Sequence, residues 1–549
     1  MKALAWRLGP LAVAVAVALA VNVSFHGQLV HDLRGRLLEG AFHHGHIWCL
    51  DHLADQVRGA APLTVYSDRV GFPDGASARC LIALPAVVAA PLQGGLGAVG
   101  TYNLVVLLTP AVAAVAAWLL ARKATDLDER GAAAVAVLYA TSPFLLGSLS
   151  GGQVCKAQVW TIPACLWALT GAVHGPRRAG WAWMAGLLGV ATAYSEPTFA
   201  LIVPLVAVPW ALGAVRRPWG WSLLGAGAGL ACLAAGLYTA KLYYDSSGAG
   251  AAELFEPAGR LNSGGIPKPT PMSQPAGIFW AADLDTQAGA TNHVSYLGRP
   301  LLVAMVLGSF VAWRGRVLAW VALGVGVTFA LGELLVVDDA YVTTAAGAKV
   351  GLPALWLAKA GYPLARSVMY YRAISVAGLG LALGAVGATS RWRWGWVLAW
   401  GLAAVGVWDT HRVLDPVWPL QSRPLRTELS AWMQADPTPG AILALPLQHN
   451  ARQGGAAVFD AVLADRATTA LIRFTSPDQP SLRRTRGWVA EAVAAPDAAA
   501  AESALYAHGV RYVVWDATAE DAEATALMTR LGSPARFGTR WAWRIGPER

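Results

Sequence analysis

The run LIALPAVVAAPL, residues 81–92, decides which topology the rest of the chain can have. It is apolar, but it is shorter than the roughly 17 to 25 residues that a helix needs to cross about 30 Å of hydrocarbon, and prolines interrupt it. If it crossed, every later loop would change sides. We therefore expect it to lie along the outer interface or to re-enter the membrane without spanning it.

Composition places the chain in a membrane. Of its 549 residues, 56% are hydrophobic and 14% are charged, with a mean hydropathy of +0.45, whereas about a quarter of a soluble domain is charged. The sequence predicts a mainly α, polytopic transmembrane helical bundle of about eleven spans. We expect these spans near residues 8–25, 102–121, 131–147, 154–173, 179–193, 197–214, 219–240, 296–313, 317–335, 369–388 and 394–409.

The positions of Lys and Arg support this arrangement, because cytoplasmic loops are enriched in both. If 81–92 does not cross, every short basic loop falls on one side of the membrane. These loops contain Lys2 and Arg7, then Arg122, Lys123 and Arg130, then Arg177 and Arg178, then Arg216 and Arg217, then Arg314 and Arg316, then Arg391 and Arg393. The pattern predicts a multi-pass protein of the cytoplasmic (inner) membrane.

The chain divides into a transmembrane domain, 1–409, and a tail, 410–549. The outer loops of the transmembrane domain are 26–101, 241–295 and 336–368. The tail carries short β-prone runs separated by Ala-rich stretches of helical character, which is typical of an α/β domain. Those runs are AILALPL (441–447), RYVVWD (511–516) and RWAWRI (540–545). We expect the tail to be extracytoplasmic.

The stretch HHGHIWCLDHLAD, residues 43–55, is the most polar part of the first outer loop. In a helix, His44, Trp48, Asp51 and Asp55 would share one face. Three interpretations remain open: a solvated interfacial helix, a metal site built on His44 and Asp51, or catalysis without a metal.

Two cysteines, Cys49 and Cys80, lie in the same outer loop. A compartment outside the cytoplasm permits disulfides. The two residues either form a bridge or remain as thiols.

Glu196, in ATAYSEPTFAL (191–201), lies between two apolar segments at the predicted outer edge of the bilayer. An ionisable group is costly so near hydrocarbon and is a functional candidate by default. Pro197 would begin the next helix, so capping of that helix by Glu196 is the alternative. Lys156 lies at a similar depth and would pair with Glu196, meet a phosphate, or extend to the interface.

Arg366 and Arg372 precede a late span on the outer side, against the usual charge bias. The guanidinium group suits bidentate binding of phosphate. Pairing with Asp338, Asp339 or lipid headgroups is the alternative. The neighbouring residues Tyr370 and Tyr371 are expected to belong to an aromatic belt.

Several motifs recur in an order that resembles a known group of membrane proteins. They are IWCLDHLADQ (47–56), VYSDRVGFPDGA (65–76), LIALPAVVAAPL (81–92), TYNLVVLL (101–108), NHVSYLG (292–298), FALGELL (329–335), PLARSVMYYRAISV (363–376) and GVRYVVWD (509–516). The chain resembles large bacterial polytopic proteins of the GT-C fold, the YfhO-like and related lipid-dependent glycosyltransferases. The resemblance covers nearly the whole chain, and its motifs are mostly structural.

The resemblance implies transfer of a sugar from a polyprenyl-phosphate carrier to an acceptor on the outer face. A carboxylate would deprotonate the acceptor, and Arg, Lys or a divalent metal would stabilise the departing phosphate. Related proteins often carry an acid shortly before the IW pair. Here those positions read AFHHGH (41–46), and the nearest acids are Glu39 and Asp51.

The sequence therefore yields a defined set of candidates. The catalytic candidates are Asp51, Asp55, Glu196 and Glu39; the substrate-binding candidates are Arg366, Arg372, Lys156, His44 and Trp48; the metal candidates are His44 and Asp51. The expected partners are a polyprenyl-phosphate-linked sugar and membrane lipids, not nucleic acid. The alternative function is a non-catalytic or transport protein that handles lipid or polysaccharide on the same scaffold.

Overall fold

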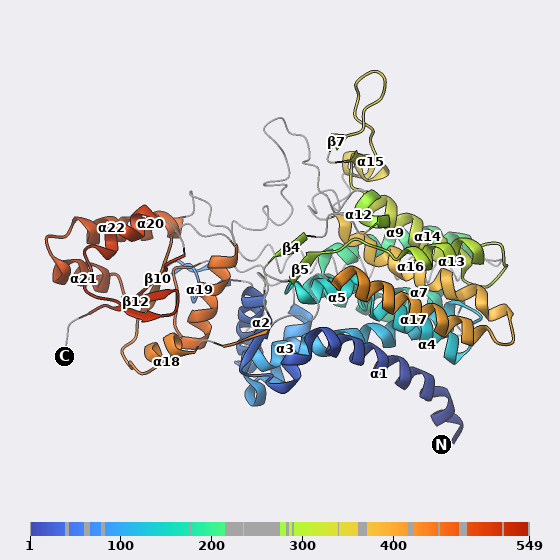
Figure 1. The fold of residues 1–549 in the computed structure, drawn as a ribbon, viewed down its shortest axis with the longest axis horizontal. Coiled ribbons are helices and arrows are strands. Elements are labelled where there is room, and N and C mark those ends of the chain that lie inside the picture. Colours follow the sequence, from blue (N-terminus) through green and yellow to red (C-terminus); the bar gives the residue numbers. More distant parts are fainter. Residues whose placement is uncertain are drawn as a thin grey trace.

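Helices form one half of the molecule and a small β-sheet with helices forms the other (Figure 1). The computed structural model describes residues 2–38, 43–59, 66–77, 83–174, 177–214, 234, 275–280, 285–287, 290–338, 340–360, 370–415, 422–425, 427–447, 451–470, 480–518 and 521–546. The amino-terminal helix begins at the far end of the bundle, and the carboxyl terminus lies at the far end of the sheet.

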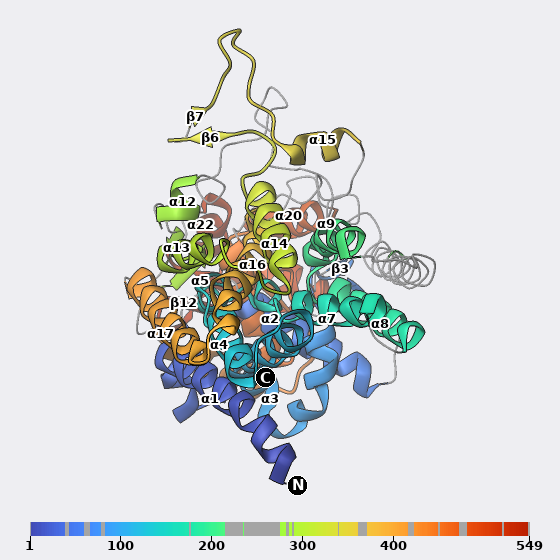
Figure 2. The same ribbon diagram turned by 90° about the vertical axis from the view of Figure 1, so that its right-hand side faces the viewer.

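The bundle is built from helices that lie roughly along one direction in Figures 1 and 2. Its longer helices are α1 (Lys2–His31), α3 (Ala83–Ala124), α4 (Glu129–Ala140), α5 (Pro143–Ser150), α7 (Thr161–His174), α8 (Arg178–Ser195), α9 (Pro197–Ala214), α13 (Arg299–Gly308), α14 (Arg316–Ala330), α16 (Ile374–Gly387) and α17 (Gly395–Leu414). Shorter helices are α2 (His43–Arg58), α6 (Val154–Ala157), α12 (Pro275–Trp280), α15 (Pro353–Lys359), η3 (Tyr370–Ala373) and η4 (Ala388–Arg391).

Each predicted span overlaps at least one described helix, except that the segment 219–240 falls outside the described residues apart from residue 234. Four described segments are long and apolar enough to cross a membrane by length and composition: Leu8–His31, Ala83–Ala124, Glu129–Ser150 and Tyr370–Arg391. The fold is thus mainly helical and of the membrane type. Helix α17 continues to Leu414, past the predicted domain boundary at 409.

The segment 81–92 does not form a helix of its own. Its described residues begin α3, whose backbone leaves the helical conformation at Gly97, with φ 69° and ψ 172°. Glycine adopts this positive φ without the steric cost that other residues meet. The kink separates an amino-terminal arm of α3 from the long apolar part that follows.

Small residues let the central helices approach closely. A Cβ on Gly380 of α16 would lie 2.5 Å from the backbone nitrogen of Leu323, and one on Gly326 of α14 would lie 2.4 Å from that of Ala377. Such contacts are the usual way in which membrane helices pack, because lipid supplies little hydrophobic drive between helices.

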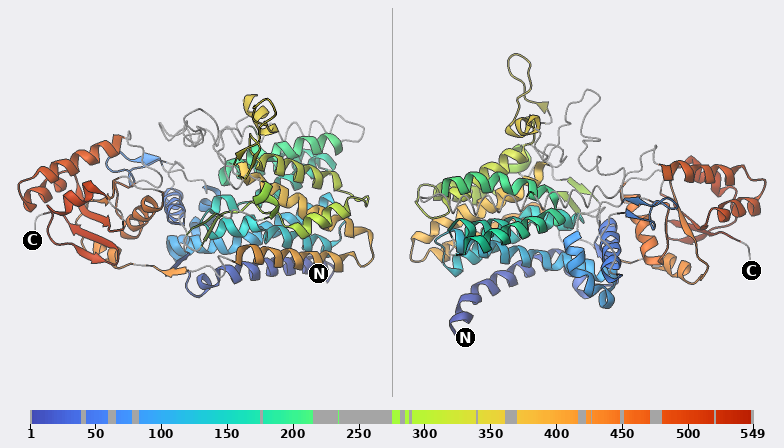
Figure 3. Two further views of the ribbon diagram at one scale, coloured as in Figure 1. Left: turned by 45° about the horizontal axis from the view of Figure 1, so that its top comes forward. Right: turned by 180° about the vertical axis from the view of Figure 1, so that it is seen from behind.

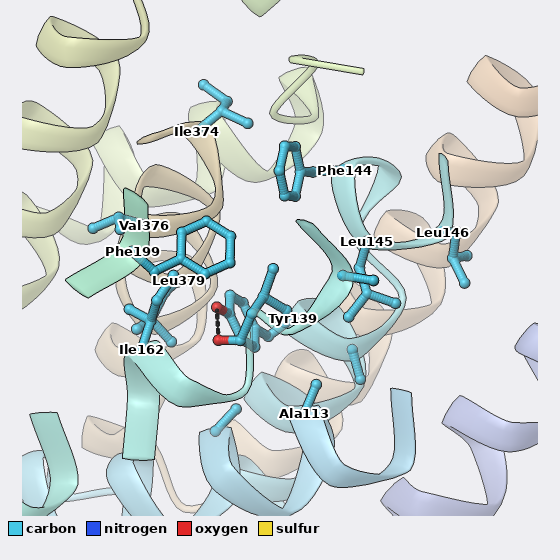
Figure 4. Packing of buried hydrophobic residues seen from close by; sticks show 14 of the residues in the cluster. Ala113, Tyr139, Phe144, Leu145, Leu146, Ile162, Phe199, Ile374, Val376 and Leu379 are labelled. Atoms are coloured by element: carbon cyan, nitrogen blue, oxygen red, sulfur yellow. Dashed lines mark hydrogen bonds between the residues drawn. The ribbon is translucent and has the colours of Figure 1, made fainter. Parts of the chain in front are cut away.

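A layer of larger side chains fills the space around these contacts. Figure 4 shows Tyr139 of α4 among Phe199, Ile162 and Leu379, with its hydroxyl donating to the Val159 carbonyl at 2.9 Å. That hydrogen bond satisfies a polar group that is fully buried.

The carboxyl-terminal part contains a four-stranded sheet in the order β11-β12-β10-β9. The strands are β9 (Ala441–Leu445), β10 (Val510–Asp516), β11 (Ala535–Phe537) and β12 (Arg540–Arg544). Strands β9 and β10 are parallel, and the others are antiparallel. Two helices pack on one face of the sheet, α18 (Glu428–Gln434) and α19 (Ala451–Ala464). Three helices pack on the opposite face, α20 (Pro480–Ala494), α21 (Ala498–Ala507) and α22 (Ala522–Met528).

The first predicted outer loop joins this sheet, although it is more than 350 residues away in sequence. Val70 and Ile442 form parallel bridges to Thr468, and the backbone nitrogen of Phe72 donates to Thr468 at 3.0 Å. Arg69 also bonds Asp465 at 2.7 Å. Helix α2 lies between the bundle and α19 (Figure 3), so it contacts both halves of the molecule.

Short hairpins and paired strands complete the described fold. They are β1 (Arg36–Leu38) with β8 (Ser422–Pro424), β2 (Tyr66–Ser67) with β3 (Ala76–Ser77), β4 (Asp285–Gln287) with β5 (Ala290–His293), and β6 (Val336–Val337) with β7 (Ala340–Tyr341).

Cys49 is disulfide-bonded, whereas Cys155 and Cys165 are free thiols. Its predicted partner, Cys80, lies outside the described residues. Peptide mapping of the unreduced protein by mass spectrometry should find Cys49 joined to Cys80. Alkylation of Cys49 without prior reduction would contradict this pairing.

The topology makes a second prediction. Reporter fusions at residues 98 and 450 should both report the outer side, because the basic loops predict that 81–92 does not cross and that the tail follows an odd number of spans. A cytoplasmic signal at 98 together with an outer signal at 450 would require a further span and contradict the model.

Candidate active site

The candidate site lies where three helical joints meet at the end of the bundle that faces α2. The chain turns between α5 and α7 through the one-turn helix α6, between α8 and α9 at Glu196, and into α16 through η3. Pro197 begins α9 and ends the preceding helix at Ser195, because proline cannot continue a helix through the residue before it. These joints bring side chains from distant parts of the sequence together.

Glu196 and Arg372 form a buried ion pair. Arg372 Nη1 lies 2.5 Å from Glu196 Oε1, and the two side chains are 10% and 1% exposed. Arg372 Nη1 also donates to Thr198 Oγ1 at 3.1 Å, while the backbone nitrogen of Thr198 donates to Glu196 Oε1 at 3.1 Å. Glu196 therefore caps α9 and pairs with Arg372, and its functional role stays a prediction.

Lys156 approaches the same place from α6. Its side chain is buried, with the residue 1% exposed, and its Nζ donates to the Tyr371 hydroxyl. Lys156 therefore does not extend to the interface. We call Lys156, Tyr371, Arg372 and Glu196 the cation cluster.

The tyrosines before Arg372 correct an expectation from the sequence. Tyr370 and Tyr371 are 5% and 4% exposed, so they are core residues and not members of an aromatic belt. The Tyr370 hydroxyl bonds Glu333 at 2.5 Å, and Tyr371 bonds Lys156. The hydroxyl groups of both tyrosines therefore hydrogen-bond to charged side chains.

The first turn of α2 packs against the same loop. His43 Nδ1 lies 2.7 Å from the Tyr102 hydroxyl, and its Nε2 lies 3.3 Å from the Ser150 carbonyl. Gly152 leaves room for this contact, because a Cβ there would lie 2.6 Å from the backbone nitrogen of His43. Burial, helped by the charge of neighbouring histidines, lowers the pKa of His43 to about 3, so its ring is neutral.

His46 follows one turn of chain further along α2. Its Nε2 lies 3.9 Å from the Sγ of Cys155, the residue before Lys156. The sequence analysis did not single out His46, Cys155 or Tyr102. The histidine-rich stretch HHGHIWCLDHLAD contains His46, but it was interpreted through the helical face that carries His44 and Asp51. No sequence pattern pointed to Cys155 or Tyr102.

That other face points away from the cation cluster. The Asp51 carboxylate accepts from Gln93 of α3 at 2.5 Å. Burial, with the nearby charge of Asp55, raises the pKa of Asp51 to about 6 against the opposing effect of Arg69 and Arg58. Asp55 is 45% exposed and pairs with both of those arginines. Among described contacts, none joins either aspartate to Glu196 or Arg372.

The predicted metal ligands do not converge. The His44 ring packs on Phe459 of α19, with centroids 4.7 Å apart, and Trp48 stacks on His52. Asp51 instead faces Gln93. Within the described residues, no group of three His, Cys, Asp or Glu side chains is arranged to hold a metal ion. A metal site on His44 and Asp51 stays a prediction, and no chemical step below uses a metal ion.

Two candidates, Glu39 and Arg366, lie outside the described residues. Their roles remain predictions. Three other candidates, Glu196, Arg372 and Lys156, lie together in the cation cluster, and their roles also stay predictions.

A pocket adjoins the cation cluster. Apolar groups from α4, α5, α13, α16 and α17 line most of it, including Leu138, Phe144 and Ile374. The rings of Phe144 and Tyr371 are 6.4 Å apart, so the pocket begins where the cluster ends. Gly378 lines it, and a Cβ there would meet no atom within 4 Å.

Solved membrane glycosyltransferases share this architecture. The arabinofuranosyltransferase AftD from mycobacteria aligns over 98% of this chain and 40% of its own, with a TM-score of 0.55 and 16% sequence identity. ArnT from Cupriavidus metallidurans, solved with undecaprenyl phosphate, aligns over 98% of this chain and 100% of its own, with a TM-score of 0.53 and 12% identity. The chain has the GT-C fold. No family model and no curated protein sequence matches it.

The ion pair makes a prediction about stability. Glu196→Ala should lower the stability of the purified protein by about 3–5 kcal/mol, because it leaves the buried Arg372 charge without its carboxylate. Removing both charges in Glu196→Leu/Arg372→Leu should cost less than the single change. Thermal unfolding in detergent measures both.

Glu129→Ala is the matched control, because the Glu129–Arg122 pair is about one third exposed. Partly exposed pairs contribute about 1 kcal/mol or less. Equal losses in Glu196→Ala and Glu129→Ala would show that burial adds nothing to the Glu196 pair.

Proposed function

We propose that this chain is a membrane glycosyltransferase that moves a sugar from a polyprenyl-phosphate carrier to an acceptor on the outer face of the cytoplasmic membrane. It belongs with the YfhO-like proteins, crosses the membrane several times, and holds its carboxyl-terminal domain outside. The observation that carries the proposal is the buried cation cluster. In this cluster Lys156 contacts Tyr371, the residue before Arg372, although Lys156 and Tyr371 are 215 positions apart in sequence.

Two buried cations beside one another suit a phosphate. Burying charged groups is costly unless they are paired, so their presence favours a function over mere packing. Lys156 and Arg372 can bind the phosphate oxygens of the carrier, and Glu196 and Tyr371 fix their positions. When the bond between sugar and phosphate breaks, negative charge grows on the phosphate. Fixed cations stabilise the transition state, in which this charge is larger, more than they stabilise the ground state, and this lowers the barrier.

The adjoining pocket is apolar like the hydrocarbon part of the carrier, but its volume is only about 20 Å³, room for about one water molecule. Its walls are mostly apolar, it begins next to Tyr371, and it lies between helices of the bundle. A polyprenyl phosphate with its phosphate on the cluster would have to move the walls of this pocket apart before its first isoprene unit could lie among Phe144, Ile374 and Leu381. The fold that this chain shares with ArnT, which binds undecaprenyl phosphate, supports this choice of carrier.

The test is direct binding of undecaprenyl phosphate to the full purified chain, measured by native mass spectrometry. Lys156→Met should weaken binding by roughly tenfold or more, because a charge-assisted hydrogen bond contributes about 1.5–3 kcal/mol. Lys123→Met is the matched control: Lys123 is also a lysine near hydrocarbon, but it lies over Trp181 and far along α3 from the cluster. Equal affinity in Lys156→Met and the wild type would contradict the proposal.

A second variant tests the pocket. Gly378→Leu places a side chain in the open space beside Gly378. It should weaken binding of undecaprenyl phosphate while leaving binding of a short-chain prenyl phosphate unchanged. Equal losses for both ligands would place the long chain elsewhere. Binding without any transfer of sugar in any donor and acceptor mixture would favour the alternative, a lipid-handling carrier.

A further inference from the structure

Lys123, near the end of α3, has a buried ammonium group that no acceptor among the described residues hydrogen-bonds. Its Nζ lies 2.9 Å from the centre of the Trp181 ring and 5.1 Å from that of Trp167. Attraction to aromatic rings offsets part of the cost of removing an ammonium from water. The group has three N–H donors and no acceptor of its own, so it can still donate to an anion.

Glycine in α7 makes room for this arrangement. A Cβ on Gly171 would collide with both the Trp181 ring and the Lys123 Nζ. The rings of Trp167 and Trp181 meet edge to face, with centres 4.8 Å apart. Trp181 lies in the first turn of α8. Helices α7 and α8 therefore hold the ammonium beside the beginning of α8.

The beginning of α8 adds positive charge to that of Lys123. Its first turn contains no acidic residue, and the side chain of Arg177, the residue before the helix, makes no capping bond. The Trp181 nitrogen donates to the Arg177 carbonyl at 3.1 Å, and the N–H groups before it cannot bond within the helix. Arg177 is exposed. These N–H groups and the helix dipole favour an anion at this end of α8.

Open space lies beside the same turn. Gly180 is exposed, and a Cβ on it would meet no atom within 4 Å. Lysine carries its ammonium on a flexible four-carbon stem. Rotation of Lys123 toward Gly180 would break no described hydrogen bond, because none holds its Nζ. An anion beside Gly180 can therefore meet both the ammonium and the first turn of α8.

This place is at the opposite end of α8 from the cation cluster. Arg177 precedes the helix and Glu196 follows it. The 18 residues between them extend about 27 Å at 1.5 Å per residue, close to the hydrocarbon thickness of about 30 Å. The basic loops predict that Arg177 lies on the inner side. The space beside Gly180 is thus expected at the depth of the inner headgroups.

One face of α8 favours a lipid over a soluble phosphate. Gly180, Trp183, Met184 and Leu187 have the spacing of residues on one helical face. The last three are 69%, 40% and 62% exposed. Acyl chains can lie along these apolar side chains while the headgroup of the same lipid lies at Gly180.

We propose that Lys123, Arg177 and the first turn of α8 bind the phosphate of an anionic phospholipid in the inner leaflet. Basic pockets between helices on the cytoplasmic side of a membrane bind such headgroups. The phosphate oxygens accept from the Lys123 ammonium, the Arg177 guanidinium and the N–H groups of the first turn. The site does not depend on the function proposed above, because it shares no residue with the cation cluster.

A charge placed at Gly180 tests the site. The carboxylate of Gly180→Glu would occupy the open space beside the first turn, so binding of phosphatidylglycerol to the full purified chain should weaken by roughly tenfold or more. Native mass spectrometry measures this binding. Gly180→Gln, which has the same shape without the charge, is the matched control and should bind nearly as well as the wild type. The melting temperature should fall in neither variant, because both residues favour a helix more than glycine does.

Removing the cations tests the same site from the other side. Lys123→Met and Arg177→Gln should each weaken binding of phosphatidylglycerol by roughly tenfold, the contribution of one charge-assisted hydrogen bond. Methionine packs well on aromatic rings, so Lys123→Met should keep the wild-type melting temperature. Arg393→Gln is the matched control, because Arg393 is another exposed arginine of the predicted inner side and lies 5.7 Å from the centre of the Trp394 ring.

Two further ligands separate the sources of phosphate. Phosphatidylcholine with the same acyl chains should bind more weakly than phosphatidylglycerol, because its headgroup carries no net charge. Free glycerol phosphate at the concentration of the lipid should not displace phosphatidylglycerol, because it lacks the chains that lie along α8. Undecaprenyl phosphate should still bind Lys123→Met through the cation cluster.

Four results would overturn the proposal. Wild-type affinity for phosphatidylglycerol in both Lys123→Met and Gly180→Glu would leave the tryptophan contacts as packing alone. An equal loss in Arg393→Gln would show a general attraction of anionic lipid to basic loops. Equal binding of phosphatidylcholine would remove the role of charge. Displacement by free glycerol phosphate would assign the place to a soluble phosphate.

Discussion

The ion pair between Glu196 and Arg372 is the interaction on which the candidate site depends. Its partners are 176 positions apart in sequence, and both are buried at the end of the bundle. Neither charge would be stable there alone, because an unpaired ion near hydrocarbon loses its hydration without compensation. The pair therefore fixes η3 against the joint of α8 and α9. That joint sets where Tyr371 and Lys156 meet.

The two sides of helix α2 contact different parts of the molecule. One side carries His43 and His46 toward Tyr102 and Cys155 in the bundle. The opposite end carries Asp55, which shares Arg69 with Asp465 of the sheet domain. Strand-like residues around Val70 extend that sheet. Helix α2 therefore contacts the bundle and the sheet domain at the same time.

The histidines at the start of α2 give this chain its own chemical character. Proteins that the sequence resembles often place an acid shortly before the IW pair, and here that stretch reads AFHHGH. A neutral imidazole and a carboxylate can both accept a proton, but they do so over different pH ranges.

The sequence by itself determined the features that depend on composition and local pattern. Hydropathy predicted the mainly helical membrane fold. The cost of charge near hydrocarbon singled out Glu196 and Lys156, and positive charge on the predicted outer side singled out Arg372. Only the tertiary structure decided what these residues touch. A helical face is visible in sequence because its period is 3.6 residues, but the element opposite that face is not. For this reason the face of Asp51 was considered and that of His46 was missed, and Tyr371 was assigned to an interface instead of to the buried charge that it bonds.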